Sequence, residues 1–130
     1  MKIVVLAGGT STERDVSLSS GSKIYRALKN RGHQVILLDV YLGYESEAPV
    51  TAELFDSELD WAKDIQAVSA EHPDLSHLKE LRKDGGKSMF GPNVLALCDM
   101  ADVVFLGLHR GNGEGGRIQA AFDLVGIPYT

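Results

Sequence analysis

The chain has 130 residues, of which 44% are apolar and 24% charged, and its net charge is −5. This length suits a single domain that can bury roughly two-thirds of its unfolded surface. The negative charge excludes the basic surface typical of nucleic-acid binding proteins, and no run of Lys and Arg indicates a contact with a membrane surface. The first apolar stretch, residues 3–7, is too short for a signal peptide or a membrane span. We therefore expect a cytoplasmic protein that binds neither nucleic acid nor membrane.

The first third of the chain predicts a strand–helix–strand unit. Residues 2–7 form a short, apolar and β-branched run, which is typical of a strand buried on both faces. After a polar loop over 8–16, the spacing of apolar residues predicts a helix over 17–31 that ends at Gly32. Residues 34–40 predict a second strand, and the crossover between the two strands is expected to be right-handed.

Residues 41–92 are less regular, and we interpret them as a variable insertion. Thr51 is a candidate N-cap for a helix, and a further helix over 74–83 and a short strand over 87–90 are expected. The apolar residues that recur at helical spacing after Thr51 are Leu54, Phe55, Leu59, Ala62 and Ile65.

The last part of the chain returns to regular elements. Its only cysteine, Cys98, fits a reducing compartment, and its apolar neighbours predict an inert core residue rather than a nucleophile. Buried strands that alternate with helices predict a three-layer, Rossmann-like α/β domain with a mostly parallel sheet. The expected elements are a helix over 94–100, a strand over 102–107, a glycine-rich loop over 108–115, a helix over 116–125 that ends at Gly126, and a last strand from residue 127.

Two loops, residues 8–17 and 109–116, follow the carboxyl ends of predicted strands and lead into helices. In a parallel sheet such loops share one edge, where ligands of open α/β sheets bind, and each helix N-terminus favours negative charge. The first loop lacks the signatures of dinucleotide and P-loop sites. By themselves Gly8 and Gly9 are most typical of a tight turn, and residues 13–15 are more typical of a solvated loop, or of acidic residues near a helix N-terminus, than of a ligand contact. The second has four glycines over 111–116, which suit a close approach of the backbone to a ligand. His109 beside them is either a donor to an anion or a structural residue.

Together the two loops resemble motifs of the D-alanine–D-alanine ligase family. Residues 8–17, Gly-Gly-Thr-Ser-Thr-Glu-Arg-Asp-Val-Ser, are similar to the family's Gly-Gly-Thr-Ser-x-Glu-Arg-Glu/Asp-Val-Ser. Residues 109–130 resemble its His-Gly-x-x-Gly-Glu-Asp/Asn-Gly motif with the apolar helix and Gly-Ile-Pro-Tyr-Thr that follow. The resemblance implies the N-terminal, pre-ATP-grasp domain of an ATP-dependent ligase that joins two D-alanines for peptidoglycan synthesis, and thereby for cell-wall biogenesis and cell shape.

The same resemblance implies what the chain binds and what it lacks. The family has three domains, and its two ATP-grasp domains, which are absent from residues 1–130, hold ATP and Mg²⁺ or Mn²⁺ in the full-length enzyme. We therefore expect the fragment alone to be inactive and to bind no cofactor or metal. Its expected partners are D-alanine and, because the family pairs through this domain, a second copy of the chain.

Two residues are expected to act as catalytic residues by this resemblance. Glu13 would bind the ammonium of the first D-alanine, since a carboxylate suits a substrate cation and orients it for reaction. His109 would lie near the D-alanyl phosphate, where a donor stabilises developing negative charge.

Four further residues are expected to bind or shape the substrate site. Val16 would line the pocket, and Ser17 would stand at the start of the first helix and cap it. Gly111 and Gly113 would hold the shape of the site.

The sequence departs from the family pattern at two positions. Arg110 stands where the family usually has Gly, so it either alters the phosphate contacts or points to solvent. Gly115 stands where Asp or Asn is usual, which removes a helix cap.

Two other interpretations are open. One is a non-catalytic module that serves as a dimerisation surface. The other is an unrelated Rossmann-like binder of nucleotides or sugar nucleotides, because Leu-Ala-Gly-Gly-Thr also opens glycosyltransferases. Such openings continue with Gly-Gly-His, whereas this chain has Ser11, Thr12 and Glu13.

Overall fold

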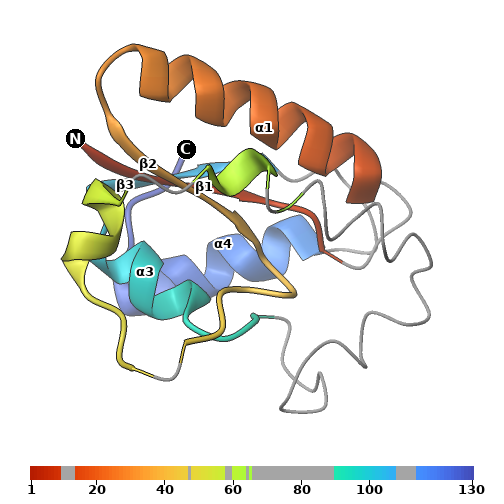
Figure 1. Ribbon diagram of the computed structural model, residues 1–130. Helices are drawn as coiled ribbons and strands as arrows, with labels where there is room; N and C mark the ends of the chain where they lie inside the picture. Colours follow the sequence, from red (N-terminus) through yellow and green to blue (C-terminus); the bar gives the residue numbers. More distant parts are fainter. Residues whose placement is uncertain (10–13, 47, 58–59, 64, 66–89, 108–113) are drawn as a thin grey trace.

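The computed structural model describes residues 1–9, 14–46, 48–57, 60–63, 65, 90–107 and 114–130. Within these residues a parallel sheet forms the middle layer (Figure 1). Helix α1 (Arg14–Asn30) covers one face of the sheet, and helices α3 (Val94–Met100) and α4 (Glu114–Val125) cover the other. The predicted three-layer α/β fold is therefore confirmed.

The sheet places its first strand in the centre. Strand β1 (Lys2–Ala7) pairs in parallel with β2 (Gln34–Asp39) on one side and with β3 (Val103–Leu106) on the other, in the order β2-β1-β3. Residues 4–7 of β1 are completely buried, which explains their continuous apolar sequence, because helices cover both faces of this strand. The predicted last strand appears as a single parallel bridge between Val104 and Tyr129.

Glycines end both long helices, as the sequence predicts. Gly32 follows α1 with φ 89°, and Gly126 follows α4 with φ 74°. The N–H of Ile127 donates to the carbonyl of Phe122 at 3.0 Å, which satisfies one of the free carbonyls at the end of α4. The chain can then turn back toward the sheet.

Both helices begin a few residues before their approximate predicted starts. Helix α1 begins at Arg14 rather than at Ser17, and Asp15 in its first turn compensates the positive end of the helix dipole. Ser17 therefore lies inside the helix and does not cap it. Helix α4 begins at Glu114, two residues before the predicted start, so Gly115 lies within the helix rather than at its cap.

The apolar residues at helical spacing from Leu54 to Ile65 do not form one continuous helix. Thr51 is the N-cap residue of a 3₁₀ helix, η1 (Ala52–Asp56), as expected, but its side chain makes no capping hydrogen bond, and Ser57 after the helix is extended. Residues 61–63 and 65 are helical again. Phe55 and Trp61 explain the break, because both are buried, whereas residues six apart on a continuous helix would point about 120° apart.

The insertion leaves and rejoins the sheet at one place. The N–H of Gly91 donates to the carbonyl of Val40 at 2.8 Å, and the N–H of Tyr44 donates to the carbonyl of Pro92 at 2.9 Å. The helix predicted over 74–83 and residues 87–89 of the predicted short strand lie outside the described residues, and Phe90 forms a bend.

Cys98 lies in the core, as predicted. It is fully buried on α3, and burial raises the pKa of its thiol from 9.0 to about 12. The thiol therefore stays protonated at neutral pH and is a poor nucleophile. In the described parts of the chain, no helix is both long and apolar enough to cross a membrane.

Candidate functional site

The carboxyl ends of the three strands meet at one edge of the sheet. Strands β1 and β3 are neighbours, but their following helices go to opposite faces: β1 leads to α1, whereas β3 leads to α4 (Figure 1). The strand order switches at this point, and such switch points open the crevice in which α/β sheets bind ligands. The two motif loops begin at Gly8 and after Gly107, on either side of it.

Ser17 joins the bases of these two loops. Its hydroxyl accepts a hydrogen bond from the N–H of Gly8 at 2.9 Å and donates one to the carbonyl of Gly107 at 2.8 Å. The side chain is buried, and the N–H of Gly107 donates in turn to the carbonyl of Leu6 at 2.8 Å. One hydroxyl thus fixes the end of β1 to the end of β3.

Asp39 organises the neighbouring end of β2. One carboxylate oxygen, Oδ1, accepts hydrogen bonds from the backbone N–H groups of Gly9, Tyr41 and Leu42, at 3.4, 2.9 and 3.3 Å. The other, Oδ2, forms an ion pair with the guanidinium of Arg14. Asp39 is only 3% exposed, and a buried carboxylate is tolerated where a cation and several N–H groups satisfy it.

Arg14 connects this carboxylate to the first loop. Its Nη1 donates to the carbonyl of Gly9 at 2.8 Å, while its Nη2 faces Asp39. The side chain of Arg14 therefore bonds the backbone of Gly9, five residues earlier in the chain. Arg14 is only 5% exposed. The sequence alone was compatible with a solvated stretch here, but the side chain of Arg14 is buried.

Gly8 lets the carboxylate come this close. A Cβ built on Gly8 would lie 2.8 Å from Cγ and Oδ1 of Asp39, and the residue has φ 80°. A side chain here would displace Asp39 as well as strain the backbone. Gly8 at the end of β1 is thus explained by the approach of a carboxylate of this same chain.

The structure describes two of the six predicted site residues. Val16 lies on the first turn of α1 and is 52% exposed, whereas Ser17 is buried in the contacts described above. The remaining four lie outside the described residues: Glu13, His109, Gly111 and Gly113. Their roles stay predictions.

Sequence reasoning missed Asp39. Its signal was its place as the one acidic residue within residues 34–40, where every other residue except Gln34 is apolar and the pattern predicted a strand. A charge at such a position needs a partner, and Arg14 is the cation that meets it.

The polar groups of this frame are engaged with one another, and the described residues do not fit a metal ion. Asp39 is committed to Arg14 and three N–H groups. Within the described ranges no group of three His, Cys, Asp or Glu side chains is placed to hold a metal.

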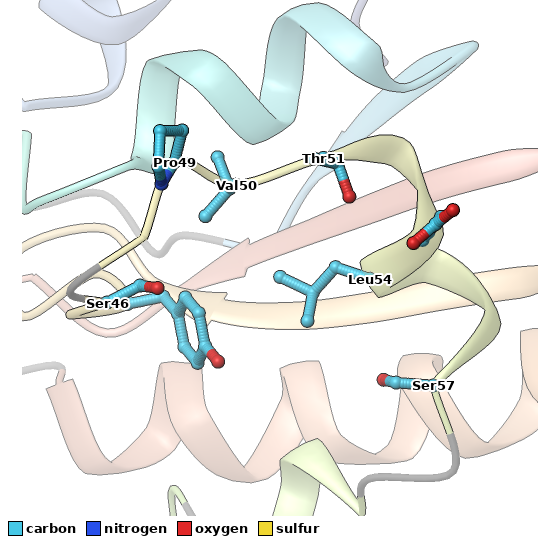
Figure 2. A pocket seen from close by; sticks show the side chains of 8 residues that line it. Ser46, Pro49, Val50, Thr51, Leu54 and Ser57 are labelled. Atoms are coloured by element: carbon cyan, nitrogen blue, oxygen red, sulfur yellow. The ribbon is translucent and has the colours of Figure 1, made fainter.

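A separate pocket of about 280 Å³ lies between η1 and the chain that follows β2 (Figure 2). Leu54, Val50 and Ser57 point toward its interior. Val16 and Ser17, the two predicted site residues that the structure describes, do not line this pocket.

Comparison with known proteins places this frame in a family. The family model described as the D-Ala-D-Ala ligase N-terminus matches residues 2–130. The D-alanine–D-alanine ligase of Lacticaseibacillus casei (strain BL23) is 48% identical over 130 residues, which are all of this chain and 36% of that protein. The ligase of Pediococcus pentosaceus is 47% identical over 130 residues, with 37% of its length covered. That of Halalkalibacterium halodurans is 37% identical over 131 residues, with 27% covered.

The chain therefore spans roughly a third of the length of the curated relatives that it matches. The family match includes both motif loops and all the elements that frame them. The chain belongs to the family of D-Ala–D-Ala ligase N-terminal domains.

Proposed function

We propose that this domain supplies part of the first D-alanine site of an ATP-dependent D-alanine–D-alanine ligase. The observation that carries the proposal is that Ser17 joins the bases of both motif loops at the switch in strand order. Residues contributed by the two loops can then act on one ligand. The family match over residues 2–130 supports D-alanine as that ligand.

The two loops would divide the work on the substrate. Glu13, next to Arg14, would bind the ammonium of D-alanine and so orient its carboxylate for reaction. His109, two residues after Gly107, would donate to the oxygens on which negative charge develops. Val16 would form a wall of the pocket from the exposed side of α1.

The domain's contribution is binding and orientation. The glycine loop with Gly111 and Gly113 would let the backbone approach the substrate closely. ATP and Mg²⁺ would be held by the parts of the ligase that correspond to the remaining length of the relatives. A cytoplasmic location and pairing of two copies through this domain belong to the same proposal.

A chimera tests the proposal. Residues 1–130 replace the segment of the Lacticaseibacillus casei ligase to which they align, and the readout is phosphate release that requires both ATP and D-alanine. We expect the chimera to be active, and we expect Glu13→Gln to lower kcat/KM for D-alanine at least tenfold, because the amide cannot pair with the ammonium. A chimera that is folded but inactive, or a Glu13→Gln variant with unchanged kinetics, would contradict the proposal.

A further inference from the structure

The geometry points to Arg14 and Asp39 as positioning residues for the substrate-binding carboxylate of Glu13. This inference rests on the proposed function and adds to it a named support for the site. Arg14 directly follows Glu13, but its own side chain is buried and turned into the frame. It acts through its neighbour and touches no substrate.

Gly9 and Arg14, which flank the segment that contains Glu13, are linked through Asp39. Before the loop, Gly9 is bonded through its N–H to Asp39 and through its carbonyl to Arg14. After the loop, Arg14 is held by its ion pair with Asp39. Gly9 and Arg14, the residues on either side of this segment, therefore belong to one closed hydrogen-bonded unit.

Asp39 fixes this hydrogen-bonded unit to the sheet. Asp39 is the last residue of β2 and is opposite Ala7 in the register of β1. Its Oδ1 also holds the backbone of Tyr41 and Leu42, where the chain leaves β2. A substrate-binding side chain gains precision when buried hydrogen bonds on rigid elements support its backbone.

Arginine suits position 14, whereas lysine does not. The guanidinium uses two nitrogens at once, one toward Gly9 and one toward Asp39. A lysine ammonium keeps the charge but lacks the planar fork that makes two directed contacts. Arg14→Lys should therefore keep the ion pair with Asp39 and lose the hydrogen bond to the carbonyl of Gly9.

The test is steady-state kinetics of the active chimera carrying Arg14→Lys. We expect KM for D-alanine to rise 10- to 100-fold while KM for ATP stays within twofold, because a displacement of about 1 Å at a binding group costs up to roughly 100-fold. A purely structural role would instead lower kcat through loss of folded enzyme and leave KM unchanged. Arg26→Lys is the matched control, since Arg26 is on the same helix but has an exposed pairing with Asp60; its kinetics should not change.

A double-mutant cycle decides whether Arg14 acts through Glu13. In the Glu13→Gln background, Arg14→Lys should change kcat/KM for D-alanine less than threefold, because the group that it positions is already lost. If Arg14→Lys does not fold, the pair Arg14→Met with Asp39→Asn removes the same closure without leaving a buried charge, and it should reproduce the rise in KM. Unchanged KM in an active parent chimera, or fully multiplicative effects in the cycle, would overturn the inference alone. A folded but inactive parent chimera would overturn the proposed function and this inference with it.

Discussion

Gly21 sets the distance between α1 and the central strand, and Gly21→Ala tests that role. A Cβ on Gly21 would lie 2.8 Å from Cβ of Ala7 and 3.3 Å from Cδ1 of Leu37. Ala7 is in β1 and is fully buried. Its methyl group is attached directly to the backbone of the central strand and cannot rotate away.

Two effects of opposite sign compete in this variant. Alanine is favoured over glycine inside a helix by about 1 kcal/mol, whereas overpacking a buried contact costs about 1–3 kcal/mol. The overlap should prevail, because relief requires α1 to move away from the sheet. Ser17, one turn earlier on α1, would then lose the geometry of its bonds to Gly8 and Gly107. We expect a net loss of about 1–2 kcal/mol in the free energy of unfolding.

Urea unfolding followed by circular dichroism measures this loss. The cycle with Ala7→Gly isolates the contact, since removing the methyl of Ala7 should make Gly21→Ala less costly by at least ~1 kcal/mol. Ser19→Ala, on the exposed side of α1, is the control and should change stability by no more than about 0.5 kcal/mol. A stabilising Gly21→Ala, or strictly additive effects with Ala7→Gly, would refute the reasoning.

Two further predictions concern buried groups of the frame and the core. Asp39→Asn should lower the free energy of unfolding by about 3–5 kcal/mol, because it leaves Arg14 buried and unpaired; Arg14→Met in addition should recover part of that loss, which urea unfolding would detect. The raised pKa of Cys98, about 12 against 9.0, corresponds to at most roughly 4 kcal/mol of stability that is present below pH 9 and is lost as pH rises toward 12. The stability of the wild type relative to Cys98→Ala should fall over that range, and a pH-independent difference would contradict the prediction.

The strands could be predicted from sequence because their signal is local. Residues 2–7 and 34–40 are apolar almost without interruption, and only burial on both faces explains such runs. Gly32 and Gly126 marked the helix ends correctly for the same reason, since a positive φ is a property of one residue. Contacts with distant parts of the chain therefore did not change the structure that these local signals predict.

Other elements could not be predicted because distant partners decide them. Ser17 has the chemistry of a helix cap, but its hydroxyl is bonded to Gly107, 90 residues away. The periodicity from Leu54 to Ile65 is helical, yet burial of both Phe55 and Trp61 interrupts the helix at Ser57. In both places local propensity is a weaker influence than packing against the sheet.

Three consecutive residues of the candidate site, 13–15, include one whose place follows from a local signal and one whose place is decided by a distant partner. Asp15 is exposed in the first turn of α1, whereas Arg14 before it is buried against Asp39. Glu13 precedes both and is the residue proposed to meet the substrate. Alternation of this kind follows from the start of a helix at the sheet edge, where successive side chains point in different directions. A short run of charged residues can therefore supply a ligand contact, the support for that contact and a partner for the helix dipole. The position of Asp39 at the end of β2 identifies Arg14 as the support.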